Sequence, residues 1–207
     1  MEFQWPQGKK LAVWIVMNIE HFEFGKLGPA LQPHLNSYPE ISNYSWRDYG
    51  NRVGIYRLFE LFSKLQLPVS AAINAEIGLL YPDICSQIKK MNWELLGHGW
   101  NNSTGHSGLE PVIEKELILK TMNRYVETFG LKPLGWLSPG FSVTENTYKF
   151  LTEQGIQYTA DWVGDDLPFW YNQLMALPYS YETNDISLLL SGQQTGPEYF
   201  QSITDHA

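Results

Sequence analysis

Short apolar runs alternate with amphipathic segments along this chain, and that alternation limits the possible folds more than any other feature. Residues 10–20 form a continuous apolar run rich in β-branched residues, typical of a strand buried on both faces. The same pattern predicts four more strands, at 67–74, 92–99, 132–140 and 156–162. The predicted helices are 52–66, 81–91, 110–130 and 144–155. Strand–helix alternation favours an α/β fold with a parallel sheet, closed into a barrel or left open.

The sequence also predicts a loop and two helix ends between these elements. A long loop is expected through residues 37–51, which are rich in Pro, Asn and aromatic residues. Gly130 is expected to end the helix 110–130, and Thr144 is expected to cap the helix 144–155. At 207 residues the chain has the length of one domain, 1–207.

The charge and the apolar pattern exclude several classes of partner. A net charge of -8 argues against nucleic acid and against anionic membranes, because both need a basic surface. No apolar run reaches the length of a membrane span, and the first ten residues lack the apolar core of a signal peptide. A cytoplasmic protein with a small-molecule substrate is the expectation.

Polar or turn-forming residues follow each predicted strand. They are Asn18, Glu20 and His21; Asn74 and Glu76; His98; Ser138 and Pro139; and Asp161, Asp165 and Asp166. In parallel α/β folds the carboxyl ends of the strands meet at one face, where active sites lie. These residues are therefore predicted to converge on one pocket, which favours an enzyme.

Two of these side chains carry the strongest case for chemistry. His98 leaves its strand between Gly97 and Gly99, which let a ligand or backbone approach closely. A carboxylate at Glu20, beside an apolar run, needs a partner, either a functional one or a salt bridge to Arg47 or Arg52.

Other candidates have equally ordinary interpretations. Asp161, Asp165 and Asp166 suit acid–base work, or are loop carboxylates. His106 is expected to be solvated in its loop, and His34 and His206 have no supporting context. The eight tryptophans and twelve tyrosines favour a pocket with aromatic walls, although many will be core residues.

Several motifs, taken in order, resemble the polysaccharide deacetylase superfamily. They include "GNRVG" at 50–54, "GHGW" at 97–100 and "ADWVGDDLP" at 160–168, and the match spans nearly the whole chain. More narrowly, the chain resembles the cytoplasmic branch with the metal-independent allantoinase. The resemblance implies a deformed (β/α)7-type barrel that hydrolyses a non-peptide C–N bond.

The resemblance also assigns a possible metal site. Zinc-dependent relatives use a carboxylate from a first-strand motif, which reads Asn18-Ile19-Glu20-His21 here, and a histidine pair at i and i+4. Glu20, or less readily His21, matches the carboxylate and His98 the first histidine, but Asn102 occupies the second position. An amide oxygen is a poorer zinc ligand than imidazole. We therefore expect either no cofactor or a divalent metal, zinc first, on Glu20, His98 and Asn102.

Relatives continue past the last residues of this chain into a strand with a late histidine motif. The domain is therefore expected to be short at its C-terminus and to lack the last strands. Because an open sheet edge invites pairing with another copy, a homo-oligomer is expected.

The leading hypothesis is a hydrolase for an amide, N-acetyl or ureide bond of a small polar or carbohydrate-like molecule. The rival is a catalytically silent relative that binds a ligand or partner, favoured by the missing late histidine. The predicted catalytic residues are Glu20, His98, Asp161 and Asp166. The predicted substrate-binding residues are His21, Trp100, Trp136, Ser138, Pro139, Trp162 and Asp165.

Overall fold

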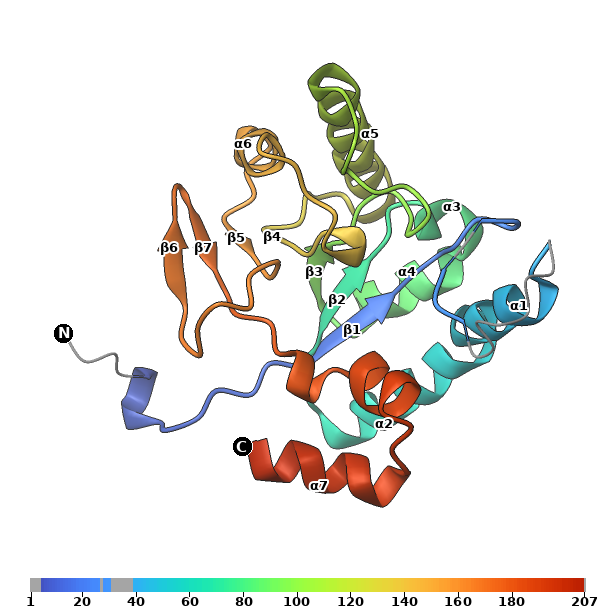
Figure 1. Cartoon of the computed structure of the whole chain (residues 1–207), viewed down its shortest axis with the longest axis vertical. Coiled ribbons are helices and arrows are strands. Elements are labelled where there is room, and N and C mark those ends of the chain that lie inside the picture. Colours follow the sequence, from blue (N-terminus) through green and yellow to red (C-terminus); the bar gives the residue numbers. More distant parts are fainter. Residues whose placement is uncertain (1–4, 27, 31–38, 207) are drawn as a thin grey trace.

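The computed structural model describes residues 5–26, 28–30 and 39–206. Its centre is a seven-stranded sheet in the order β1-β2-β3-β4-β5-β7-β6 (Figure 1). The strands are β1 (Val16–Ile19), β2 (Ser70–Ile73), β3 (Glu94–Gly97), β4 (Gly135–Trp136), β5 (Tyr158–Thr159), β6 (Phe169–Tyr171) and β7 (Leu174–Ala176).

The predicted parallel arrangement is confirmed. Strands β1 to β5 pair in parallel in chain order, and β7 joins β5 in parallel. Only β6 runs the other way, as the first arm of a hairpin with β7. β1 and β6 are the two ends of the sheet among the described residues. Self-association through an open edge stays a prediction.

Helices cover the sheet between successive strands. The α-helices are α1 (Ile41–Tyr49), α2 (Ile55–Leu65), α3 (Ile77–Leu80), α4 (Pro82–Lys90), α5 (Pro111–Phe129), α6 (Thr147–Glu153) and α7 (Gly196–His206). Proline stands at the first position of α5, where its missing N–H costs nothing. As predicted, Gly130 ends this helix, with a φ of 81°.

Three local predictions were wrong. The expected loop at 37–51 contains α1, which continues through a π-helical turn (Gly50–Gly54) into α2; residues 37 and 38 lie outside the described part. The first strand is shorter than the predicted 10–20, because only residues 16–19 lie opposite β2 and pair with it. Val13, which precedes the paired residues, is 75% exposed. The N-cap of α6 is Asn146 rather than Thr144, whose hydroxyl instead accepts the Asn146 N–H at 3.0 Å.

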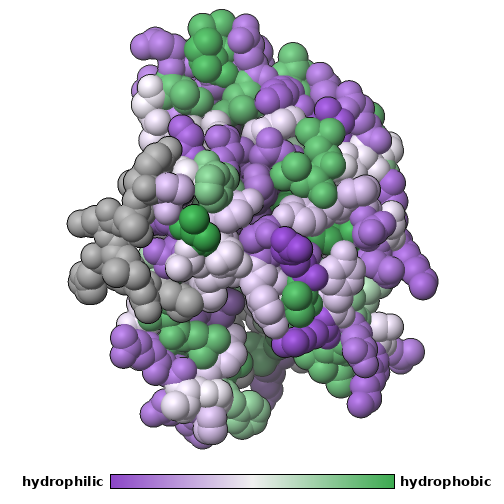
Figure 2. Space-filling model, turned by 90° about the vertical axis from the view of Figure 1, so that its right-hand side faces the viewer, coloured by the Kyte–Doolittle hydropathy of each residue, from purple (hydrophilic) through white to green (hydrophobic). Residues whose placement is uncertain are grey.

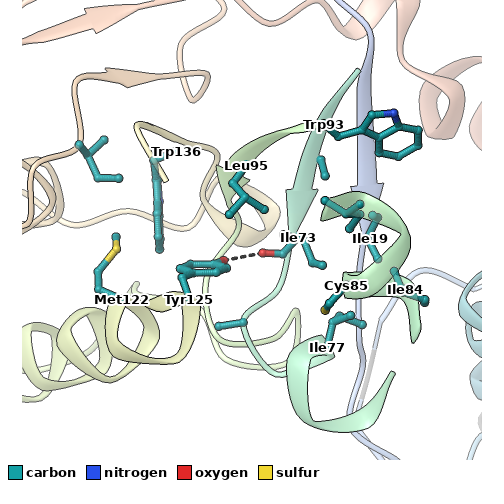
Figure 3. Packing of buried hydrophobic residues seen from close by; sticks show 14 of the residues in the cluster. Ile19, Ile73, Ile77, Ile84, Cys85, Trp93, Leu95, Met122, Tyr125 and Trp136 are labelled. Atoms are coloured by element: carbon teal, nitrogen blue, oxygen red, sulfur yellow. Dashed lines mark hydrogen bonds between the residues drawn. The ribbon is translucent and has the colours of Figure 1, made fainter. Parts of the chain in front are cut away.

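The core lies between the sheet and helices α2 to α6. Alternate residues of a strand face opposite sides, so Ala71 and Ile73 of β2 pack under the helices while Ala72 faces the other side. Figure 3 shows Tyr125 of α5 between Trp136 and Ile73, with Met122 of the same helix beside Trp136. The Tyr125 hydroxyl donates to the Ile73 carbonyl, so this large buried ring leaves no unpaired polar atom.

The face shown in Figure 2 mixes hydrophobic with hydrophilic residues and has no continuous apolar band. Among the described residues, no helix combines the length and the apolar character that crossing a bilayer requires.

Candidate active site

The carboxyl ends of the parallel strands bring the predicted residues to one face. Glu20 follows β1 directly, His98 follows β3 directly, and Asp161 comes two residues after β5. Residues 78 positions apart in the sequence, Glu20 and His98, thereby come into contact. The convergence inferred from strand ends is confirmed for these residues.

His98 and Glu20 form a hydrogen-bonded pair. The imidazole Nε2 lies 3.1 Å from Glu20 Oε1, and Nδ1 lies 2.6 Å from the Leu137 carbonyl oxygen. A carbonyl oxygen only accepts, so Nδ1 must carry a proton. Carboxylate and imine nitrogen are both acceptors, so a second proton must lie between Nε2 and Oε1. The pair is therefore an imidazolium with a carboxylate, or a neutral imidazole with a carboxylic acid.

The two partners differ in exposure. The His98 side chain is 3% exposed, whereas that of Glu20 is 21% exposed. Glu20 is therefore the partner that can exchange a proton with a bound molecule, and His98 is the buried partner. Neither Arg47 nor Arg52 pairs with Glu20, because Arg47 lies 3.8 Å from Glu40 and Arg52 lies 3.7 Å from Asp48.

Asp161 is held beside this pair by the turn after β4. Its two carboxylate oxygens accept the Ser138 backbone N–H at 2.6 Å and the Ser138 hydroxyl at 2.8 Å. The Trp136 indole N–H donates to the same hydroxyl oxygen at 2.9 Å. Burial raises the pKa of the Asp161 carboxyl above its usual value, while the bonds from Ser138 and the nearby His98 oppose that rise.

Three further residues support the site, and of these only Asn74 was among the strand-end residues predicted to converge there. The fully buried Asn74 donates to the His98 carbonyl and accepts the His21 N–H at 2.7 Å, so it ties the ends of β1 and β3 together. The Tyr125 hydroxyl accepts the His98 N–H at 2.9 Å. Asn51, from the π-helical turn, donates to the Glu20 carbonyl at 2.6 Å. The "GNRVG" motif and the strand-end position of Asn74 were the available signals.

Four predicted substrate-binding residues serve packing or support instead. Trp136 is fully buried in the core, which corrects its expected place on a pocket wall. Ser138 is also buried and bonded to Asp161, and Pro139 packs so close to Gly99 that a Cβ there would lie 2.3 Å from its ring. The Trp100 indole N–H donates to Glu76 at 3.1 Å, and Lys120 lies over its ring.

Of the remaining predicted residues, one lies beside Asp161, and the side chains of three do not bond to the Glu20–His98 pair. Trp162 stays beside Asp161 and stacks on Tyr171, with ring centroids 4.3 Å apart. His21 faces Glu76 at 3.7 Å rather than the Glu20–His98 pair. Asp165 and Asp166 are exposed in the loop before β6, and within the described residues neither bonds to Glu20 or His98. Asp165 accepts the Leu167 N–H at 3.0 Å, which makes it a turn residue.

His106 is not solvated as predicted. It is 1% exposed, and its Nδ1 lies 3.5 Å from a carboxylate oxygen of the equally buried Glu114. Burial lowers the pKa of His106, although the Glu114 charge opposes this. His34 lies outside the described residues.

The donors do not fit a resident zinc ion. A catalytic zinc site needs three protein ligands that converge on one point. Glu20 and His98 are hydrogen-bonded to each other, and the Asn102 amide oxygen already accepts from Asn74 at 2.9 Å. Within residues 5–26, 28–30 and 39–206, no three or more His, Cys, Asp and Glu side chains group so as to hold a metal ion. The set Glu20, His98 and Asn102 therefore does not assemble a metal site in this arrangement.

No family model matches the chain. A curated relative is the "putative polysaccharide deacetylase" of Schizosaccharomyces pombe, 25% identical over 88% of this chain and 67% of that protein. The solved structure of the allantoinase PuuE superposes with a TM-score of 0.83 at 24% identity, covering 98% of this chain and 72% of that one.

Two further solved structures share the fold. A "probable polysaccharide deacetylase" from Pseudomonas aeruginosa PAO1 gives a TM-score of 0.80 at 24% identity over 93% of this chain and 70% of its own. A CE4 family pseudoenzyme from Bacillus anthracis gives 0.56 at 12% identity over 75% and 47%. The chain therefore has the fold of these deacetylase and allantoinase structures, and its sequence is distantly similar to a putative polysaccharide deacetylase.

Proposed function

We propose that this protein hydrolyses a non-peptide carbon–nitrogen bond in a small polar or carbohydrate-like molecule, such as an N-acetyl, amide or ureide group. The observation that carries the proposal is the 3.1 Å contact between His98 Nε2 and Glu20 Oε1, with Nδ1 2.6 Å from the Leu137 carbonyl oxygen. A carboxylate–imidazole pair that is partly open to solvent is suited to general acid–base catalysis.

In the proposed reaction, water attacks the carbonyl carbon and gives a proton to the pair, with Glu20 as the accepting partner. The proton then passes to the leaving nitrogen as the C–N bond breaks. His98 shares the charge through its hydrogen bond to Glu20. Asn74 and Tyr125 fix the His98 backbone, so the imidazole is already oriented before a substrate binds.

The test is a hydrolysis assay on a panel of N-acetylated sugars, simple amides and cyclic and linear ureides, with Glu20→Gln as the matched variant. This substitution keeps the shape of Glu20 but removes its ability to accept a proton. We expect turnover of at least one compound class and a loss of roughly 100-fold to 10,000-fold in Glu20→Gln. Equal rates for the two proteins would refute the role of the pair.

The second candidate is a silent relative that binds without turnover. Asn102 stands where zinc-dependent relatives have a metal-ligating histidine, and its amide oxygen accepts a hydrogen bond from Asn74, which supports this candidate. A pseudoenzyme with this fold supports it as well. Elemental analysis of protein purified without chelator separates the two candidates further. Stoichiometric metal that is lost in His98→Gln would contradict the metal-free chemistry. Absence of turnover across the panel, in folded protein, would favour the silent relative.

A further inference from the structure

A cavity of about 750 Å³ is lined by Asp161 but not by Glu20 or His98. Its walls come from α6, from the residues after β5 and from the β6–β7 hairpin. Figure 1 shows α6 above β5 and the β6–β7 hairpin to its left. The volume suits a small molecule. Asp161 belongs to both places, since it lines the cavity and interacts with the charge of His98.

Three mutually contacting aromatic rings line the cavity. The Trp162 ring centroid lies 4.3 Å from that of Tyr171 and 6.1 Å from that of Tyr148, and the two tyrosine rings meet edge to face at 5.8 Å. The Tyr148 hydroxyl also interacts with the Asp161 carboxyl. The aromatic group is therefore adjacent to a negatively charged or hydrogen-bond-accepting group.

The charged side chains of the wall are mainly acidic. Glu145, Glu153 and Asp161 line the cavity against a single ammonium group, that of Lys149. Glu153 is already paired with Lys115 at 2.7 Å, which leaves Glu145 and Asp161 as acceptors facing one cation. A carboxylate accepts up to about four hydrogen bonds. Asp161 already accepts two from Ser138 and interacts with the hydroxyls of Thr159 and Tyr148, so Glu145 is the wall carboxylate with free capacity for a ligand.

We infer that this cavity binds a flat cationic nitrogen group, such as a guanidinium or amidinium, between the rings of Trp162 and Tyr171 and the carboxylate of Glu145, beside Asp161. A planar cation gains from the faces of aromatic rings and from paired hydrogen bonds to a carboxylate. A carboxylate or phosphate ligand would meet like charge there. This inference rests on the proposed function: for a hydrolase with this cavity, the expected substrates are molecules that carry a flat cationic nitrogen group.

The test compares two probes of one shape by isothermal titration calorimetry. Phenylguanidine carries the flat cation, and phenylurea is its neutral counterpart. We expect saturable binding of phenylguanidine, tighter than that of phenylurea by roughly threefold to thirtyfold. Glu145→Gln should reduce this preference. Equal affinity for both probes, or no saturable binding of phenylguanidine, would overturn the inference.

The hairpin offers a matched pair of variants. Tyr171 lines the cavity, whereas its neighbour Trp170 on β6 does not and is 68% exposed. Tyr171→Ala should weaken phenylguanidine binding roughly threefold to tenfold, and Trp170→Ala should leave it unchanged. If both variants weaken binding equally, or neither does, the probe binds elsewhere and the assignment fails.

One further variant keeps this inference separate from the proposed function. His98→Gln should abolish hydrolysis and leave phenylguanidine binding intact, because the imidazole is not part of the cavity wall. Binding by a protein that hydrolyses nothing would refute the proposed function but support the cavity. Hydrolysis of neutral substrates by a protein that does not bind phenylguanidine would refute the cavity.

Discussion

Two histidine–carboxylate pairs lie within this chain, and they are built differently. In the first, both ring nitrogens of His98 have partners, and Glu20 is 21% exposed. In the second, neither ring nitrogen of His106 has a hydrogen-bond partner, and Glu114 is completely buried 3.5 Å away. The same two residue types thus form a partly exposed, hydrogen-bonded pair in one place and a fully buried pair in the other. Environment, rather than residue type, decides which.

The carboxylates show the same contrast. Glu114 accepts the hydroxyls of Thr144, at 2.6 Å, and Thr147, so it joins α5 to the start of α6. Within the described residues Glu20 accepts from His98 alone at its side chain, so its second oxygen is open to a substrate or water. A fully used carboxylate stabilises the fold, and a partly used one is available for chemistry.

The largest effect should come from His98→Gln, which removes the shared proton. We expect hydrolysis of the best substrate in the panel to fall roughly 100-fold to 10,000-fold. The control is His206→Ala at an exposed surface pair with Glu182, which should keep full activity. If His98→Gln kept activity, the two pairs would not differ in function and the comparison would fail.

Glu114→Ala should give the largest loss of stability. It leaves two threonine hydroxyls without their acceptor and empties a fully buried site, so the free energy of unfolding should drop by about 2–4 kcal/mol. Urea denaturation at pH 7.5 measures it. Glu116→Ala, an exposed glutamate on the same helix, is the matched control and should show no measurable change. If the Glu114→Ala protein were as stable as this control, Glu114 would make no contribution to the free energy of unfolding.

Much of the fold and part of the site could be predicted from the sequence. Apolar runs and turn residues located β1 to β5, five of the six strands that run in parallel, because burial on both faces leaves a local signal. The strand-end rule brought Glu20 and His98 to one face, because it depends only on topology. Neither argument needs to know which side chain touches which.

The errors have a common physical origin in tertiary packing. His106 lies in a loop of small polar residues, and its burial against Trp136 and Glu114 depends on residues far along the chain. The α1 segment has few strong helix formers, and the continuous helical path into α2 is not visible in local propensity. The positioning role of Asn74 exists only once three strands are adjacent.

A third prediction sharpens the comparison through pH. The folded protein keeps His106 neutral, because burial lowers its pKa below the ordinary value near 6.5. Below about pH 6.5 the unfolded chain binds a proton that the folded chain resists, so stability should fall as the pH falls from there. Each unit of pKa difference is worth about 1.4 kcal/mol.

Urea denaturation at pH 7.5, 6.5 and 5.5 measures this dependence, and other groups are removed by comparison with His106→Phe. As the pH falls, the free energy of unfolding should decrease more for the unmodified protein than for His106→Phe. Parallel curves would mean that His106 is protonated as readily in the folded protein as in the unfolded chain.

The smallest effect should come from His106→Phe at pH 7.5. A buried imidazole without hydrogen-bond partners gains little beyond packing, and burying its polar nitrogens has a cost that a phenyl ring avoids. The ring also packs beside Trp136, with centroids 6.1 Å apart, an arrangement that phenylalanine can reproduce. We therefore expect the free energy of unfolding to change by less than about 1 kcal/mol. One pair would then have partners of very unequal importance, with Glu114 holding two helices together and His106 replaceable, whereas losing either member of the Glu20–His98 pair removes activity. A loss of several kcal/mol in His106→Phe would instead show that the imidazole stabilises Glu114 as an ion pair, and the two pairs would then be alike.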